Sequence, residues 1–407
     1  MNIGETLKEL WGTSGFANFT WQNIVMLIIA CILLYLAIKK KFEPLLLVGI
    51  AFGILLTNLP VGNISDSIFH ATWWTGQGFE GGISPAMDAE GHINYGYILQ
   101  NGGLLDILYI GVKTGVYPCL IFIGVGAMTD FEPLISNPKS LLLGAAAQGG
   151  IYIVFFFACM MGFNGGEAAS ISIIAGADGP TAIWLTKSLA PNLLAPIAVA
   201  AYSYMALIPL IQPPLMKALT TPKERMVMMK PTRPVTKREK ILFPIIVTLL
   251  TCLVLPSVAP LLGCLMFGNL LRETGVTTRP SDTASNALMN IVTLFLGISV
   301  GATAIGTNFL SLNTLKIIAL GLAGFVFATI CGLLLGKLLY VLSRGKINPL
   351  IGSAGVSAVP MAARVSNQVG LKYNSSNYLL MHAMGPNVAG VIGSAVAAGF
   401  LMAVFSA

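Results

Sequence analysis

An acidic residue inside an apolar segment is the first feature of this sequence that could do chemistry. Asp178 lies in the run Gly176–Thr181, between two hydrophobic stretches. A carboxylate at membrane depth is costly, so it is usually paired, hydrated or bound to a cation. Gly179 and Pro180 interrupt a helix at this point, and an interrupted helix survives in a bilayer only where it is buried in protein or lines a polar cavity. The pattern favours a Na+ ligand at Asp178 over the simpler interpretation, an acidic cap for the helix that follows.

A second interruption lies near the carboxyl end, in the run from His382 to Gly390. Gly385 and Pro386 precede Asn387 in an otherwise apolar segment. A hard cation such as Na+ takes oxygen ligands, so the Asn387 side chain and unwound backbone carbonyls are candidates to join Asp178 around one ion. Paired Gly/Pro-interrupted segments in the two halves of a chain point to a transport site near the bilayer midplane.

A third irregular segment, residues 348–366, is rich in small residues and is expected to form a hairpin. Near its end, Arg364 could hold a carboxylate through a bidentate pair or anchor the chain at the membrane interface, and its position leaves both readings open. From residue types alone, Asn348 and Ser357 are either ligands or hairpin caps, and caps are slightly favoured. Tyr202 and Tyr204 are both interpreted as buried tyrosines that each find one hydrogen-bond partner.

The composition defines the class of protein. Of 407 residues, 55% are hydrophobic and only 10% are charged, against about 25% charged in soluble domains. The apolar blocks approach the ~20 residues that a helix needs to cross a bilayer. We therefore predict an all-α polytopic membrane protein with about ten transmembrane helices and two re-entrant, Gly/Pro-broken hairpins. The spans are expected near residues 24–38, 44–59, 104–128, 141–162, 193–215, 241–255, 259–271, 287–305, 315–342 and 378–405.

The cysteines and histidines argue against a metal or disulfide framework. The six cysteines lie in or beside apolar segments without a CxxC pair, and His70, His92 and His382 have no ligand spacing.

Positive charge is concentrated in one loop. Residues 42–112 contain no Lys or Arg, whereas Lys217–Lys240 contains eight. Cytoplasmic loops of membrane proteins retain positive charge, so we place this basic loop in the cytoplasm and do not expect a nucleic-acid partner. With that orientation, residues 168–187 must enter and leave the membrane on the same side, as a re-entrant hairpin. A basic loop is also suited to docking an acidic partner.

The predicted organisation follows from these signals. An external segment covers residues 1–22. The first membrane half, 23–215, carries an external cap at 63–101 and the broken hairpin at 168–187. The basic loop is 216–240, and the second half, 241–407, contains the hairpin 348–366 and a broken helix near 382–390. The run Phe122–Ala127 echoes Leu296–Ala302, which indicates an inverted repeat.

Four longer motifs carry a family resemblance. They are Gly176–Ile183, Ala201–Pro214, Lys346–Ser366 and Met381–Gly390. In this order they resemble the beta subunit of the sodium-pumping, biotin-dependent decarboxylases, a family that includes oxaloacetate, methylmalonyl-CoA and glutaconyl-CoA decarboxylases. The resemblance extends from about Lys40 to the end of the chain.

The resemblance implies an activity and partners. The chain would decarboxylate carboxybiotin, consume a proton and export Na+ across a bacterial inner membrane. Biotin would be carried by a partner, because the Met-Lys-Met context of a biotin-accepting lysine is absent. The implied partners are a carboxyltransferase and biotin-carrier subunit and a small gamma-type membrane subunit, around a homo-oligomeric core.

The resemblance also implies site residues. Asp178, Asn387 and Ser357 would bind Na+, and Tyr204, Ser357 and Arg364 would serve proton delivery and the carboxybiotin carboxylate. The positions implied to be sensitive in the substrate site or hairpins are Asn348, Gly352, Gly179, Pro180, Gly385 and Pro386.

Two other interpretations compete. The helix interruptions, Asp178 and the charge pattern fit a Na+-coupled secondary transporter of an organic anion equally well. A purely structural membrane scaffold leaves an acid beside a Gly-Pro interruption unexplained.

Overall fold

The structure is a computed structural model that describes residues 11–12, 15–40, 44–60, 68–76, 78–205 and 207–406. Residues 1–10 and 13–14 of the predicted external segment, and residues 63–67 and 77 of the predicted cap, lie outside the described residues. Within the described residues the chain is helical, and an isolated bridge between Met87 and Ile93 is the one β pairing. This confirms the all-α class.

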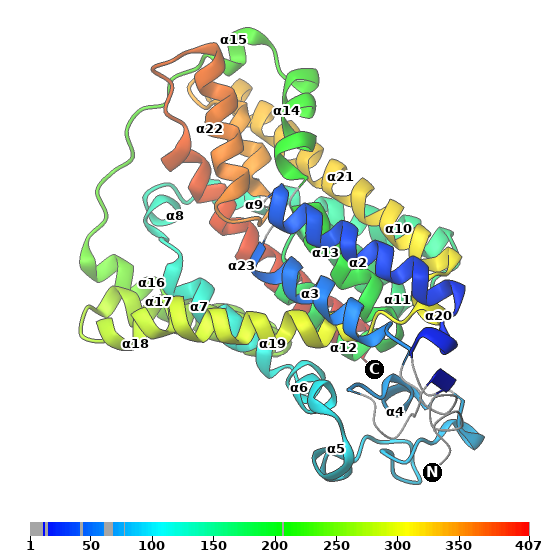
Figure 1. Ribbon diagram of the computed structural model, residues 1–407. Coiled ribbons are helices and arrows are strands. Elements are labelled where there is room, and N and C mark those ends of the chain that lie inside the picture. Colours follow the sequence, from blue (N-terminus) through cyan, green and yellow to red (C-terminus); the bar gives the residue numbers. More distant parts are fainter. Residues whose placement is uncertain are drawn as a thin grey trace, which may run out of the picture. The chain divides into compact units, whose positions relative to one another are not determined.

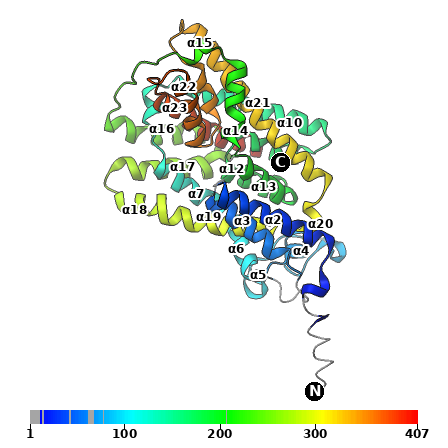
Figure 2. The same ribbon diagram turned by 45° about the horizontal axis from the view of Figure 1, so that its top comes forward.

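The chain forms two compact units, each assembled from segments distant in sequence. The first unit comprises Met1–Tyr117, Leu194–Val199 and Asn290–Leu315. Its described elements are η1 (Gly15–Asn18), α2 (Trp21–Lys39), α3 (Pro44–Thr57), α4 (Ala71–Thr75), η3 (Glu80–Gly82), α5 (Tyr95–Asn101), α6 (Leu104–Lys113), most of α19 (Met289–Ala302) and α20 (Gly306–Phe309). Figure 1 and Figure 2 both show α2 and α3 side by side.

The second unit comprises Pro118–Leu193, Ala200–Met289 and Lys316–Ala407. It contains every residue that the sequence analysis predicts for the site. Its elements are α7 (Val116–Met128), α8 (Glu132–Ser136), α9 (Ser140–Ala147), α10 (Gly149–Met160), α11 (Gly165–Ser172), η4 (Ile173–Gly176), α12 (Gly179–Leu189), η5 (Pro191–Leu193), the end of α13 (Leu194–Met205), α14 (Ile208–Leu219), α15 (Pro222–Arg225), α16 (Lys237–Val254), η6 (Pro256–Val258), α17 (Ala259–Thr274), α18 (Thr278–Thr283), the π-helical η7 (Ala284–Leu288), α21 (Leu312–Leu342), η8 (Pro349–Gly355), α22 (Met361–Tyr373) and α23 (Leu380–Phe405).

Five helical stretches among the described residues are long and apolar enough to cross a bilayer, or seven if each of two bent helix pairs is one span. The five are Trp21–Lys39, Ser140–Met160, Thr278–Ala302, Leu312–Leu342 and Leu380–Phe405; the bent pairs are Leu104–Lys113 with Val116–Met128, and Pro191–Tyr204 with Ile208–Leu219. The membrane class is therefore confirmed, whereas a count of about ten is not. Helix α3 has only 14 residues. The first turn of α16 is charged, and the apolar part of the helix begins only after that turn.

The interruption in residues 168–187 falls where the Gly-Pro motif predicts it. Helix α11 continues into the short η4, which ends at Gly176, and α12 begins at Gly179. Ala177 between them takes a left-handed conformation with φ of 58°, which a residue with a side chain rarely adopts. Asp178 thus lies at the amino terminus of a new helix, flanked by unwound backbone.

The broken helix predicted near residues 382–390 does not occur. Helix α23 runs unbroken from Leu380 to Phe405 with Pro386 inside it. Because proline lacks an N–H, the carbonyl of His382 loses its intrahelical donor, yet a transmembrane helix tolerates such a loss when neighbouring elements pack around it. Here the turn around Pro386 is buried against η8, α8 and α9.

The predicted hairpin 348–366 corresponds to η8 followed by α22. All seven residues of η8 are buried, and the Ser353 and Ser366 hydroxyls, one from each arm, lie 2.8 Å apart. Figure 1 shows α22 beside α23, so the hairpin lies along the carboxyl-terminal helix.

A buried carboxylate organises the part of the predicted cap that is described. Asp106, fully buried at the start of α6, accepts hydrogen bonds from the His70 backbone N–H (3.0 Å) and the Trp74 ring N–H (2.8 Å). The His70 Nδ1 lies 2.7 Å from its second oxygen. These contacts satisfy the charge that burial would otherwise penalise, and they tie α4 to α6.

Glycines allow two helix pairs to approach closely, one in each unit. In the first unit, a Cβ added at Gly301 would lie 2.1 Å from the Ile50 carbonyl oxygen. In the second, a Cβ at Gly268 of α17 would lie 2.0 Å from the Ile123 carbonyl oxygen of α7, and one at Gly126 would meet α17 equally closely. Small residues at helix interfaces are typical of membrane proteins. The two runs that echo each other in sequence thus both contain a glycine contact.

Replacement of Gly268 by alanine should force α7 and α17 apart. The added methyl group would overlap a backbone carbonyl, which cannot move away as a flexible side chain would, so we expect a loss of about 1–3 kcal/mol in the free energy of unfolding. Denaturation in detergent measures it. The control is Gly263→Ala on the same helix, where a Cβ meets nothing within 4 Å. Equal effects of the two substitutions would contradict the packing account.

Candidate functional site

Asp178 lies at the centre of the site because the interrupted helix exposes backbone around it. Its carboxylate is 3.5 Å from the Thr181 N–H, a long contact for a helix cap. A Cβ at the adjacent Gly179 would lie 2.1 Å from the Tyr202 ring, so only glycine fits there. The capping interpretation therefore describes a weak contact, and most of the carboxylate's capacity to accept hydrogen bonds or bind a cation is left for other groups.

Helix α23 reaches the interruption through Ser394. The Ser394 hydroxyl is fully buried and lies 2.9 Å from the Asp178 Oδ2. Its oxygen also lies 3.0 Å from the Val391 carbonyl, so one proton is shared between two acceptors. Among the described residues no lysine, arginine or histidine forms an ion pair with Asp178. A half-buried carboxylate without a protein cation is suited to bind one from solution.

The hairpin contacts the same interruption through Ser357. Its hydroxyl donates to the Gly176 carbonyl at 2.6 Å, and its backbone N–H donates to the same oxygen at 3.3 Å. The Gly176 carbonyl is one of the groups that the end of a helix leaves without an intrahelical donor. Ser357 therefore joins the η8–α22 hairpin to the α11–α12 interruption.

Asn387 holds the hairpin against α23. Its amide nitrogen donates to the carbonyls of Val356 (2.7 Å) and Ala354 (3.0 Å), while its oxygen Oδ1 is buried without a hydrogen-bond partner. An unpaired buried acceptor is costly, and a cation or a proton donor would relieve the cost. The residue contacted by Asp178, Ser394, lies seven positions further along α23, an axial rise of about 10 Å. Asp178 thus meets α23 about two turns beyond the level of Asn387.

Gln148 is a polar residue of the site that the sequence analysis missed. It joins α9 to α10, is buried, and directs its amide nitrogen toward the Gly390 carbonyl of α23 at 3.3 Å. Its oxygen has no hydrogen-bond partner among the described residues. A single glutamine between apolar residues gives no sequence signal, because the same pattern occurs in ordinary helix packing.

The Tyr204 hydroxyl bonds to α21 and not to Asp178. It donates to the Ile318 carbonyl of that helix at 2.5 Å, and the Tyr204 ring packs edge-on against Phe325. The tyrosine beside Asp178 and Gly179 is Tyr202, whose ring faces the glycine. Sequence reasoning weighed the two tyrosines equally and then preferred Tyr204 by resemblance alone.

Asn348 anchors the basic loop to the hairpin. Its amide nitrogen donates to the carbonyls of Arg225 (3.0 Å) and Val227 (2.9 Å), and its oxygen accepts the Leu350 N–H. All of its polar groups are thereby used. Gly352 in the same hairpin approaches α21 closely, since a Cβ there would lie 2.1 Å from the Gly332 carbonyl.

Gly385 and Pro386 are buried in the first turns of α23. A Cβ at Gly385 would lie 2.8 Å from the Ser140 hydroxyl at the start of α9. These two residues therefore permit close packing of α23. Pro180 lies in the first turn of α12, where its fixed φ favours the start of a helix.

Arg364 is exposed on α22, and no hydrogen bond or ion pair among the described residues holds it. The structure therefore does not bring Arg364 together with Asp178. Its guanidinium group stays available to a carboxylate from outside the chain.

Two adjoining cavities, of about 330 and 270 Å³, lie between the basic loop and the start of α23. They share Met229, Pro231, Thr232 and His382, and the second is also lined by Lys230, Arg233 and Lys346. Arg233 forms a 2.7 Å ion pair with Glu239, and its hydrogen bond lowers the pKa of that carboxyl to about 2. Lys230 and Lys346 give the second cavity a positive lining.

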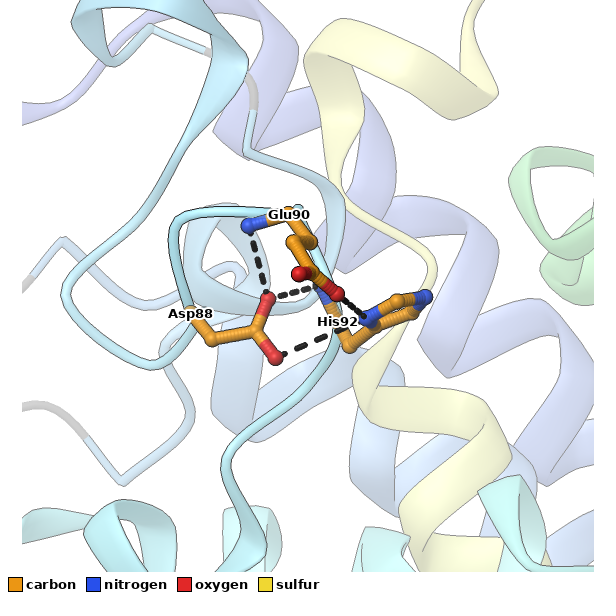
Figure 3. Close-up of side chains that lie close together, drawn as sticks. All are labelled: Asp88, Glu90 and His92. Atoms are coloured by element: carbon orange, nitrogen blue, oxygen red, sulfur yellow. Dashed lines mark hydrogen bonds and ion pairs between the residues drawn. The ribbon is translucent and has the colours of Figure 1, made fainter.

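Asp88, Glu90 and His92 form an exposed cluster in the predicted cap (Figure 3). The Asp88 carboxylate accepts the backbone N–H groups of His92 (2.8 Å) and Glu90 (3.0 Å), and these bonds, chiefly that from His92, lower its pKa. The cluster is explained as a hydrogen-bonded turn in which Gly91 has a positive φ.

Comparison with known proteins bears on the function of this arrangement. Residues 22–405 match the family described as Na+-transporting oxaloacetate decarboxylase beta subunit. The chain is 55% identical to methylmalonyl-CoA decarboxylase subunit beta of Propionigenium modestum, with 98% of this chain and 99% of that protein covered. It is 53% identical to glutaconyl-CoA decarboxylase subunit beta of Acidaminococcus fermentans (96% and 95% covered) and 50% identical to the oxaloacetate decarboxylase beta chain of Klebsiella pneumoniae (98% and 98%).

These similarities extend over nearly the whole chain and include the four motifs that carry the resemblance. They do not favour the alternative of a Na+-coupled carrier of an organic anion. The chain belongs to the family of beta subunits of Na+-transporting decarboxylases.

Proposed function

We propose that this chain decarboxylates carboxybiotin presented from the cytoplasm and uses the free energy released to export Na+. The observation that carries the proposal is the meeting of three elements at Asp178. The interrupted helix presents the carboxylate, α23 contacts it through Ser394, and the hairpin joins the same backbone through Ser357. Any movement of the hairpin relative to α23 would therefore change the contacts around Asp178.

Na+ would bind at Asp178 as the transported substrate. The carboxylate supplies the charge, and the neighbouring hydroxyl and carbonyl oxygens supply the hard ligands that Na+ prefers. Ser357 takes part by controlling the Gly176 carbonyl, since its hydroxyl must turn away before that oxygen can accept a cation. Asn387 offers a second unpaired oxygen two turns away along α23.

Decarboxylation breaks the bond between the ureido nitrogen of biotin and its carboxylate carbon. CO2 leaves, the bonding electron pair stays on the nitrogen, and the nitrogen takes a proton. Loss of solvation around the carboxylate favours this step. Ser357 and Tyr204 are the proposed proton route, and Tyr204 must first exchange its bond to the Ile318 carbonyl.

The carboxylate of carboxybiotin, approaching from the cytoplasm, would meet positively charged side chains of this chain. Arg364 is exposed and without a partner in the described chain, and the cavity beside the basic loop is lined by Lys230 and Lys346. Asn348 links that loop to the hairpin through two hydrogen bonds. Arrival of the substrate at the loop could thereby be transmitted to the hairpin.

Coupling requires that Na+ and carboxybiotin favour different states of one bistable element. We propose that the η8–α22 hairpin and the α11–α12 interruption move as one body, because Ser357 joins them. The predicted inverted repeat, with its halves at 23–215 and 241–407, would supply the scaffold against which they move.

The proposed setting follows from the family. The partners are a carboxyltransferase and biotin-carrier subunit and a small gamma-type membrane subunit around a homo-oligomeric core. The proposed location is a bacterial inner membrane, with the basic loop 216–240 in the cytoplasm.

Biotin dependence tests the function directly. The assembled complex, reconstituted in vesicles, should take up Na+ during decarboxylation and stop when avidin captures the biotin. The isolated subunit should transport no organic acid but should release CO2 from free carboxybiotin when Na+ is present. Na+-driven uptake of an organic acid by the isolated subunit, insensitive to avidin, would favour the carrier instead.

Asp178→Asn should abolish Na+-dependent decarboxylation of carboxybiotin. Removal of the one charge opposite a buried cation costs about 3 kcal/mol or more, or roughly a 100-fold weaker Na+ interaction. The measurement is CO2 release against Na+ concentration. Asp282→Asn, at an exposed acid of α18, is the matched control and should keep native kinetics. An unchanged Na+ response in Asp178→Asn would refute the assignment.

Ser357→Ala should weaken the junction between the hairpin and the interrupted helix. The hydroxyl bond to Gly176 contributes about 1 kcal/mol, so we expect roughly a fivefold fall in decarboxylation rate and a lower ratio of Na+ moved to CO2 released. Parallel measurement of ²²Na+ flux and CO2 gives that ratio. Ser285→Ala, at a half-buried serine of η7, serves as control. A native ratio in Ser357→Ala would exclude the junction from coupling.

A further inference from the structure

Gln148 is an unexplained polar group at the centre of the second unit. Its side chain is only 5% exposed, and it lies between α9 and α10 in a span that is otherwise apolar. A buried amide normally satisfies both its nitrogen and its oxygen. The Gln148 nitrogen faces two hydrogen-bond acceptors, whereas its oxygen has no donor among the described residues.

The orientation of the Gln148 amide follows from its neighbours. Two backbone carbonyls, those of Gly390 at 3.3 Å and Gly144 at 3.4 Å, face one end of the group. Carbonyls accept and cannot donate, so the nitrogen must point toward them. The oxygen Oε1 consequently points the other way, where it has no hydrogen-bond donor.

The free oxygen points toward the interrupted helix. A Cβ built on Gly176 would lie 3.5 Å from Gln148 Oε1 and 3.2 Å from the Ser394 Cβ. Ser394 in turn contacts the Asp178 carboxylate. The Gln148 side chain also crosses α23 at Gly393, where an added Cβ would lie 2.9 Å from its Cγ. Gln148 thus lies on α23 between the level of Asn387 and that of Ser394.

This arrangement has the chemistry of a monovalent cation site. One carboxylate balances one positive charge, and neutral amide and hydroxyl oxygens complete the ligands without adding charge. No ion pair with a described residue competes for Asp178. An apolar packing role would not require an oxygen held without a partner among the described residues beside the Gly176 end of the interrupted helix.

We propose that Gln148 is a Na+ ligand that shares the ion with Asp178 and Ser394. The inference rests on the proposed function and adds a residue from a third element, the α9–α10 span, to the site. Since the same side chain contacts α23 through Gly390, the ion would also connect that span to α23.

Two substitutions at Gln148 test the contribution of its oxygen separately from that of its nitrogen. Gln148→Met and Gln148→Glu both lose the amide N–H groups, but only Gln148→Glu keeps an oxygen. We expect Gln148→Met to raise the Na+ concentration for half-maximal thermal stabilisation of the purified subunit about tenfold, a typical loss at a metal site. Gln148→Glu keeps an oxygen ligand and should raise that concentration less than Gln148→Met does. Thermal unfolding in NaCl against KCl at constant ionic strength gives both, without any need for turnover.

Asn269→Leu is the matched control. Asn269 is also buried, donates to the Thr129 carbonyl and has an oxygen without a partner, but it lies on α17 against α7. It should lower the unfolding temperature and leave the Na+ response native. Equal Na+ responses in Gln148→Met and Gln148→Glu would overturn the proposal. A native Na+ response in Asp178→Asn would instead mark failure of the proposed function itself.

Discussion

The interrupted helix between Gly176 and Gly179 is the constraint on which the rest of the second unit depends. A helix that ends in apolar surroundings leaves backbone groups without intrahelical partners, and each unpaired group is costly where water is scarce. Two serines from different elements contact the interruption, one at a backbone group and one at a side chain. Ser357 donates to the Gly176 carbonyl, and Ser394 contacts Asp178. The interruption is therefore stable only when the hairpin and α23 both pack against it.

Close backbone packing makes this dependence mutual. A Cβ at Gly390 of α23 would lie 2.3 Å from the Gly355 carbonyl of the hairpin, and Gly352 meets α21 at a similar distance. Because glycine has no side chain, these contacts cannot absorb a displacement through a change of rotamer. Tightly packed elements of this kind shift between discrete arrangements and do not deform continuously. That property is what a pump needs, since partial movements would leak ions.

The polar groups of the site are distributed along α23 and are not gathered at one point. Asp178 reaches the helix at Ser394, Gln148 crosses it at Gly390 and Gly393, and Asn387 lies a turn further toward the start of α23. Buried oxygens in an apolar interior are costly unless they serve an ion or a proton. These groups follow one another along a helix that Pro386 does not break.

The amino-acid sequence by itself determined the membrane class, the place of the first interruption and the position of Asp178 within it, because hydrophobic blocks, Gly-Pro pairs and an acid between apolar stretches are local signals. It also specified the family, through four motifs in order. Only the tertiary structure decided that α23 continues through Pro386, that the ring of Tyr202 faces Gly179, and that Gln148 lies near Gly176. These depend on which groups from distant segments meet. A proline is tolerated, or an amide oxygen is left without a partner, only through neighbours that sequence spacing does not specify.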